Sequence, residues 1–214
     1  MSCNLEKQLL AAPVVAICRH VPADRLIPAA QALYEGGIRF LEVTMNSEGA
    51  LESIAALARH FEGTDMVIGA GTVIGRENAL AVLAAGAHFL VCPHTDPEVI
   101  ETALAADALP LPGVMTPTDI AMALKAGAKV LKLFPAGALG SDYVKHVRGP
   151  FDRVPLLAVG GVDLSNAPEY IAAGCVGLGL GSSLVDNKLI AAGDYPELTR
   201  RAADYMALFA DQEK

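Results

Sequence analysis

The 214-residue sequence has no Trp, only four cysteines and only 19% charged residues. The cysteines, of which Cys3 is the first, form no C-x-x-C pair, so we expect neither a disulfide framework nor a zinc site. No uninterrupted apolar run approaches the roughly 18 to 20 residues of a membrane span. The first seven residues also lack the basic start and apolar stretch of a signal peptide. We therefore expect a cytoplasmic protein in a reducing compartment, with no membrane partner.

Positive charge is also scarce, because 16 Lys and Arg residues stand against 24 Asp and Glu residues. The net charge of -8 is spread without blocks, which argues against a nucleic acid or an anionic membrane held by general attraction. Any anionic ligand must therefore be bound by local contacts in its site. Hydrophobic residues make up 53% of the chain and mean hydropathy is +0.40, so a substantial core is expected and disorder is excluded.

Short apolar runs recur along the chain, separated by stretches with helical periodicity and helix-end signals such as Ser47 and Asp96-Pro97. Because the runs are almost continuously apolar, they resemble parallel strands that are buried on both faces. Eight such strand–helix units predict an α/β fold, a single-domain (β/α)8 TIM barrel over residues 1–214 with a last helix at about 195–211. The eight runs are Pro13 to Arg19, Phe40 to Met45, Met66 to Val73, Phe89 to His94, Ala108 to Val114, Val130 to Ala136, Val154 to Gly161 and Val176 to Ser183.

An open doubly wound sheet is the competing fold, and it would carry a glycine-rich phosphate loop after its first strand. Here the first run ends in Cys18-Arg19-His20, without such a loop. Glycine-rich turns instead end the third, seventh and eighth runs, and the last two are where barrels bind phosphate. This distribution favours the closed barrel.

Lys132 is the one lysine inside a buried-type run. Enclosure disfavours a charged amine, which lowers its pKa and frees it to attack a carbonyl. A structural salt bridge is the other interpretation. In a barrel, however, polar groups at the carboxyl ends of strands are catalytic candidates, so we favour a nucleophile.

Glu42 lies in the apolar run Phe40 to Met45. Burial raises the pKa of a carboxyl group and a neighbouring cation lowers it, so a balanced carboxyl group can move protons. Glu42 could also neutralise a buried cation such as Lys132 or Arg19, and the two roles are compatible.

Further ligand-binding candidates lie at other strand ends. Arg19 can hold a carboxylate through two parallel hydrogen bonds, and Thr72 with adjacent amides can complete that contact. Glycine pairs allow an anion close to the backbone, and the eighth run adds a hydroxyl at what could be a short helix start. The predicted phosphate-binding residues are Gly160, Gly161, Gly181 and Ser182.

Pro93 lies near the end of the fourth run and is a further candidate for substrate contact. The five histidines have no HxH or HExxH spacing, so no metal site is predicted. We likewise expect no cofactor.

Four segments together resemble the KDPG/KHG aldolase family, the class I aldolases of 2-keto-3-deoxy-6-phospho-sugar acids. They are Leu41-Glu42-Val43-Thr44, Gly69-Ala70-Gly71-Thr72-Val73, Pro112 to Thr118 and Leu131-Lys132-Leu133-Phe134-Pro135, followed by Gly160-Gly161. The likeness covers about residues 12 to 186.

The resemblance implies a homotrimer of barrels in which Lys132 forms a Schiff base with the keto acid and Glu42 transfers protons. It also implies that Arg19 and Thr72 lie near the substrate carboxylate and that the loops at Gly160, Gly161 and Ser182 bind the phosphate. Phe134 is expected either to pack over the pyruvyl part or to be an ordinary core residue. The implied products are pyruvate and D-glyceraldehyde 3-phosphate.

Two departures bear on the substrate, a phosphorylated keto acid. Asn46 stands where many gluconate-type members have Arg, and Val159 stands where many have Thr before the glycine pair. Both resemble the 2-keto-3-deoxy-6-phosphogalactonate branch, whereas Cys92-Pro93-His94 resembles the broader keto-hydroxyglutarate group. Cleavage of 4-hydroxy-2-oxoglutarate, a non-covalent phosphate-binding barrel isomerase and a non-catalytic sugar-acid phosphate sensor are the alternatives.

Overall fold

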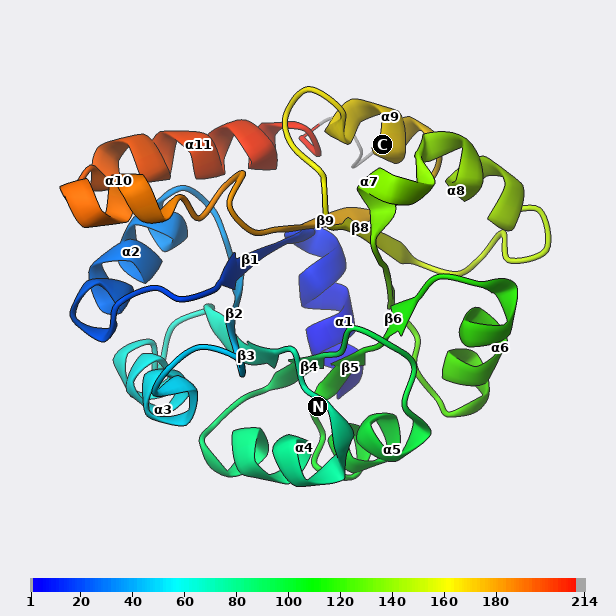
Figure 1. Cartoon of the computed structure of the whole chain (residues 1–214), viewed down its shortest axis with the longest axis horizontal. Coiled ribbons are helices and arrows are strands. Elements are labelled where there is room, and N and C mark those ends of the chain that lie inside the picture. Colours follow the sequence, from blue (N-terminus) through cyan, green and yellow to red (C-terminus); the bar gives the residue numbers. More distant parts are fainter. Residues whose placement is uncertain (1, 211–214) are drawn as a thin grey trace.

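The chain forms a parallel β-barrel surrounded by helices (Figure 1), as seen in a computed structural model that describes residues 2–210. One sheet contains the nine strands, in the order β5-β4-β3-β2-β1-β9-β8-β7-β6. The strands are β1 Val14–Cys18, β2 Phe40–Thr44, β3 Val67–Gly71, β4 Phe89–Val91, β5 Leu109–Leu111, β6 Gly113–Val114, β7 Leu131–Leu133, β8 Leu156–Val159 and β9 Gly177–Leu180.

All helices except the first lie around the outside of the strands (Figure 1). No helix within residues 2–210 combines the length and apolar character needed to cross a membrane. The helices are α1 Ser2–Ala11, α2 Ala23–Glu35, α3 Ala50–His60, α4 Gly75–Ala84, α5 Pro97–Ala105, α6 Pro117–Lys125, α7 Ala136–Leu139, α8 Ser141–Val147, α9 Ala167–Ala172, α10 Asn187–Ala192 and α11 Tyr195–Ala207.

The barrel prediction is confirmed, with one strand more than the eight expected. The fifth apolar run is divided at Pro112 into β5, which pairs with β4, and β6, which pairs with β7. Proline has no N–H group to donate to a ladder, so the run changes neighbours there. Its carbonyl oxygen still accepts a hydrogen bond from the backbone N–H of Lys132, at 2.9 Å. The divided run thereby joins the two edges of the sheet.

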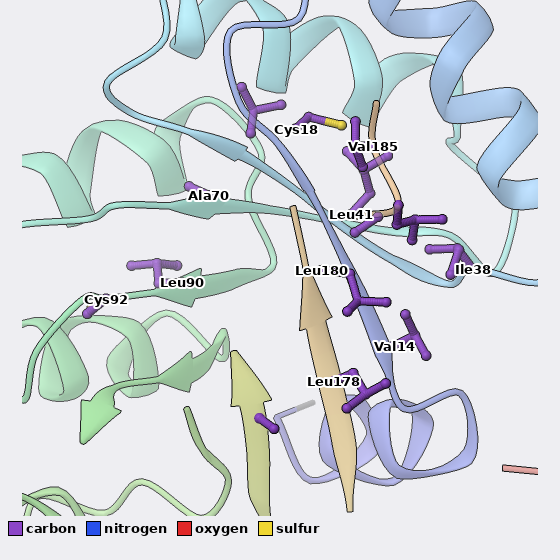
Figure 2. Close-up of a cluster of buried hydrophobic side chains, with 14 of the residues drawn as sticks. Val14, Cys18, Ile38, Leu41, Ala70, Leu90, Cys92, Leu178, Leu180 and Val185 are labelled. Atoms are coloured by element: carbon purple, nitrogen blue, oxygen red, sulfur yellow. The ribbon is translucent and has the colours of Figure 1, made fainter. Parts of the chain in front are cut away.

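The strands are apolar throughout because both of their faces are buried. On β1, Val14, Ala16 and Cys18 belong to the core between sheet and helices, whereas Val15 and Ile17 belong to the barrel interior. This division follows from the alternation of side chains along a strand. Figure 2 shows the outer face, where Val14 lies beside residues of its register partner β9.

Two expectations about helix starts have different outcomes. Asp96 caps α5 by accepting the backbone N–H of Glu98, as the sequence indicates. Ser47, expected to cap the following helix, does not: α3 begins at Ala50, after Gly49. The Ser47 hydroxyl instead bonds to groups at the ends of β1 and β2. The predicted last helix is α11, and residue 211 lies outside the described residues.

The first helix closes the amino-terminal end of the barrel. Leu9 is fully buried and belongs to the interior cluster together with side chains from six of the strands. The helix is also held at this end by a 2.8 Å hydrogen bond from Gln8 Nε2 to the carbonyl oxygen of Asp65, which precedes β3. While α1 covers this end, the interior adjoins a pocket at the carboxyl ends of the strands.

We predict that Leu9→Ala lowers the free energy of unfolding by about 2 to 5 kcal/mol, because it leaves a cavity in the barrel interior. Leu10, its neighbour on the same helix, is 38% exposed, and Leu10→Ala should cost less than about 1 kcal/mol. Urea unfolding of both variants measures the difference. Equal losses would contradict the packing of Leu9 against the barrel interior.

Candidate active site

Lys132 lies in the middle of β7 and points into the barrel interior, where it lines a small cavity. Its neighbours in register are Gly113 on β6 and Leu157 on β8, and the residue is only 7% exposed. Burial lowers the pKa of the amine, although the charge of Glu42 opposes this effect. The structure thus provides a lysine that loses its proton more easily than a lysine in water.

Glu42 lies on β2 and lines the same cavity from across the barrel. It is 2% exposed, and its Oε2 atom is buried without a hydrogen-bond partner among the described residues. Burial raises the pKa of this carboxyl group from 4.5 to about 7, against the opposing charges of Lys132 and then Arg19. Near neutral pH the group can therefore both give and take a proton.

The space around Glu42 depends on a glycine of the next strand. A Cβ atom at Gly71 would lie 2.2 Å from Oε1 of Glu42, which is closer than atoms can approach. The glycine-rich end of β3 therefore serves packing as well as any ligand contact. The cavity that remains between Glu42 and Lys132 has room for about one water molecule, whose centre can occupy about 10 Å³.

A larger pocket opens above this cavity, with a volume of about 740 Å³. Lys132 belongs to the lining of both spaces, and so do Ile17, Val159 and Gly179. The amine therefore stands where the barrel interior meets the pocket. The pocket brings together seven of the residues that the sequence singled out: Arg19, Lys132, Phe134, Gly160, Gly161, Gly181 and Ser182.

The glycine pair of the pocket is required by its backbone conformation and by close packing. Gly160 and Gly161 have φ angles of 86° and 75°, in the region that favours glycine. A Cβ atom at Gly160 would also come within 2.9 Å of the Phe134 ring. The centroid of that ring lies 4.5 Å from Nζ of Lys132, so the phenylalanine covers one side of the amine.

The segment after β9 differs from the expected short helix start. Residues 181–185 form a turn in which the backbone N–H groups of Leu184 and Val185 both donate to the carbonyl oxygen of Gly181. The next helix, α10, begins only at Asn187. Ser182 is exposed and lines the pocket. It therefore belongs to a turn, not to a helix N-terminus.

Two of the predicted binding residues are not part of either cavity lining. Thr72 follows β3 with a φ angle of 56°, and Pro93 follows β4, with its backbone packed against Gly113. Both lie at the same end of the barrel as the pocket. Their contact with a substrate stays a prediction.

The pocket also contains polar residues that the sequence reasoning missed. They include His20 after β1 and Asp163 after β8. Their positions just beyond predicted strands are a signal by which the sequence could have revealed them. The others lie in and beyond the long connection after β9, where no sequence pattern marked a site: Ser183, Asp186, Asn187 and Lys188. No group of three or more potential metal-ligating side chains was found in the part of the chain that the structure describes.

Comparison with known sequences identifies one family. A family model described as KDPG and KHG aldolase matches residues 5–201. A 2-dehydro-3-deoxy-phosphogluconate aldolase of Treponema pallidum is 38% identical over 188 residues, which is 87% of each chain. A 2-dehydro-3-deoxy-6-phosphogalactonate aldolase of Escherichia coli is 37% identical over 174 residues, covering 80% of this chain and 84% of the relative.

Solved structures agree with this result. A native KDPGal structure superposes with a TM-score of 0.85 at 33% identity, covering 92% of this chain and 94% of the other. A Legionella pneumophila KDPG aldolase, with pyruvate captured as a covalent carbinolamine, has a TM-score of 0.86 at 29% identity, covering 92% and 96%. A designed protein cage, made by fusing symmetric oligomeric domains, has a TM-score of 0.84 at 32% identity, covering 92% of this chain and 71% of that chain.

Burial of Glu42 predicts a specific pH dependence of stability. Its pKa of about 7 in the fold, against 4.5 ordinarily, means that the folded protein holds this proton more tightly than the unfolded chain. The contribution to stability is therefore complete below about pH 4.5, is lost progressively as the pH rises from there, and is gone above about pH 7. Glu42→Gln should remove this decline and exceed the wild type by on the order of 3 kcal/mol at about pH 8, with little difference at about pH 4.

Urea unfolding of both proteins across this pH range measures the effect. Glu48→Gln, at an exposed position in the segment after β2, is the control and should follow the wild type. Parallel stability curves for wild type and Glu42→Gln would contradict the raised pKa.

Proposed function

Since the chain belongs to the KDPG and KHG aldolase family, and is thus a lyase, we propose that it cleaves 2-keto-3-deoxy-6-phospho-sugar acids to pyruvate and D-glyceraldehyde 3-phosphate. The observation that carries this proposal is the pair Lys132 and Glu42, buried around one cavity that adjoins the pocket. A non-covalent isomerase would not need an amine at this place. The carbinolamine of the Legionella relative supports covalent chemistry with a keto acid.

Lys132 acts as the nucleophile. Its neutral amine attacks the C2 carbonyl carbon of the keto acid, and loss of water from the carbinolamine gives an iminium ion. Burial favours the neutral amine, which is the reactive form. The Phe134 ring beside Nζ limits the access of water to the iminium.

Glu42 moves the protons. The iminium accepts the electron pair of the C3–C4 bond while Glu42, directly or through a water molecule, removes the proton of the C4 hydroxyl group. The aldehyde leaves, the resulting enamine is protonated at C3, and hydrolysis releases pyruvate and the free amine. A carboxyl group with a pKa of about 7 suits these opposite transfers at neutral pH.

The two ends of the substrate are anionic, and the pocket offers a different contact to each. Arg19 binds the carboxylate next to the reacting carbonyl, with Thr72 as a further donor. The backbone at Gly160, Gly161 and Gly181, with the Ser182 hydroxyl, binds the phosphate. Such local contacts are needed because the net charge of -8 repels an anion.

The 2-keto-3-deoxy-6-phosphogalactonate epimer is the favoured substrate of the proposal. Val159 lines both the cavity and the pocket, so an apolar side chain lies beside the reacting part of the substrate. Without a hydroxyl there, the site has less means of selecting the gluco configuration at C4. Asn46 is exposed and is not part of the pocket lining, so Val159 carries the argument.

Assembly as a homotrimer and a cytoplasmic location complete the proposal. The cage built by fusing symmetric oligomeric domains supports self-association. Exposed apolar side chains also support it: Ile74, Leu80, Met115 and Met122. The described cysteines Cys18, Cys92 and Cys175 are free and buried, which fits a reducing compartment; the side chain of Cys3 lies outside the described residues.

Borohydride reduction in the presence of pyruvate should attach a stable three-carbon adduct to Lys132 and inactivate the protein, because only an iminium is reduced to a permanent amine. Peptide mass mapping locates the adduct. Lys132→Arg should remove both labelling and cleavage without unfolding, since guanidinium is not a nucleophile at neutral pH. Lys129→Arg, an exposed neighbour, is the matched control and should behave as the wild type. An adduct on another lysine would refute the assignment.

Val159→Thr should shift the ratio of kcat/KM values for the two C4 epimers toward the gluco form, by about 1 to 3 kcal/mol if the new hydroxyl meets the C4 hydroxyl. A coupled cleavage assay on both phospho-sugar acids gives the ratio. Val159→Ala changes the volume without adding a hydroxyl and should not produce this shift. A wild-type protein that prefers the gluco epimer by about a hundredfold would overturn the galactonate preference but not the aldolase reaction.

A further inference from the structure

Arg19 lines the pocket, but no other side chain holds its guanidinium group in place. It follows β1 directly and is exposed. Among the described residues the guanidinium has no ion pair or hydrogen bond. A long side chain without partners keeps its rotamer freedom. The direction in which Arg19 enters the pocket therefore depends on the backbone from which it extends.

That backbone adopts an uncommon conformation. His20, the next residue, has a φ angle of 54°. Within residues 2–210, His20, Thr72 and Asp107 are the non-glycine residues with positive φ. Such a conformation costs on the order of 1 to 3 kcal/mol and persists only where surrounding contacts enforce it.

Two side chains hold the peptide unit between Arg19 and His20, one at each edge. The N–H of His20 donates to Oγ of Ser47 at 2.9 Å, and the carbonyl oxygen of Arg19 accepts from Nδ2 of Asn187 at 3.2 Å. Because a peptide unit is planar, fixing both edges fixes ψ of Arg19 and φ of His20. These contacts account for the uncommon conformation.

Ser47 is itself held by the strand that carries Glu42. Its Oγ lies 3.0 Å from Oγ1 of Thr44, the buried last residue of β2, and its backbone N–H donates to the Thr44 carbonyl at 2.9 Å. The Ser47 oxygen accepts a hydrogen bond from the backbone N–H of His20, so the hydroxyl hydrogen of Ser47 is available to donate to Thr44. A short chain of hydrogen bonds thus joins the end of β2 to the peptide beside Arg19.

We propose that Ser47 and Asn187 are positioning residues that set Arg19 for the carboxylate of the keto acid. This inference rests on the proposed function, in which Arg19 binds that carboxylate. Guanidinium–carboxylate pairing requires a fixed planar orientation, so a loosened peptide weakens binding. Lys132 and Glu42 are held by their own strands, so the proton-transfer step stays nearly unchanged.

Exchange of the pyruvate methyl protons with solvent, followed by NMR, isolates this end of the substrate because pyruvate has no phosphate. Ser47→Ala should raise the half-saturating pyruvate concentration about 5- to 10-fold, with the maximal exchange rate within about twofold of the wild type. Asn187→Ala should act in the same direction. Ser47→Thr, which keeps a hydroxyl, should restore most of the affinity.

A double-mutant cycle with Arg19→Ala distinguishes positioning from a general structural role. If Ser47 acts through Arg19, then Ser47→Ala adds less than about twofold in the Arg19→Ala background. Losses of equal size in both backgrounds would overturn the inference. Should Ser47→Ala fail to fold, the same cycle with Asn187→Ala decides the question.

Thr64→Ala is the matched control. Its hydroxyl also accepts a backbone N–H, that of Met66, but at the amino-terminal end of the barrel. This variant should leave pyruvate affinity unchanged. A loss of affinity as large as that of Ser47→Ala would contradict the inference. Absence of pyruvate labelling at Lys132 in the wild type would overturn the proposed function. If pyruvate labels Lys132 normally but Ser47→Ala and Arg19→Ala lower pyruvate affinity additively, only the positioning role is overturned.

Discussion

The burial of one amine and one carboxyl group in the same barrel is the constraint on which the active site depends. Both groups are buried, so each shifts toward its neutral form, and each charge opposes the shift of the other. The same burial that makes the pair costly for the fold favours the neutral amine of Lys132 and raises the pKa of Glu42 to about 7.

Much of the surrounding structure makes room for this pair. Gly71 on β3 leaves the space that the Glu42 carboxyl group occupies, and Gly160 leaves the space for the Phe134 ring beside the lysine. The α1 helix closes the amino-terminal end, so the interior communicates with solvent through the pocket at the carboxyl ends of the strands. Reactivity and substrate access are therefore set by the same closed sheet.

The family relationship and the site agree on aldol cleavage through a lysine. In the proposed mechanism the reaction needs little more than an amine, a carboxyl group and contacts for two anionic ends. Lys132 and Glu42 line one cavity, and Arg19, Gly160 and Gly161 line the adjoining pocket. In the proposal, substrate choice and substrate affinity depend on finer features. These are the apolar Val159, which lines both the cavity and the pocket, for the choice of epimer, and the hydrogen-bonded peptide beside Arg19 for affinity.

The sequence by itself determined the barrel, the family and the candidates Lys132 and Glu42. Strands buried on both faces leave a continuous apolar pattern, and an ionisable residue within such a run stands out. Only the tertiary structure decided how these residues meet. It revealed the division of the fifth run at Pro112, the turn at Ser182 in place of a helix start, and the role of Ser47 in holding the Arg19–His20 peptide rather than capping a helix. Each of these depends on hydrogen bonds between segments far apart in the chain or on a local turn, and no periodicity along the sequence records such partners.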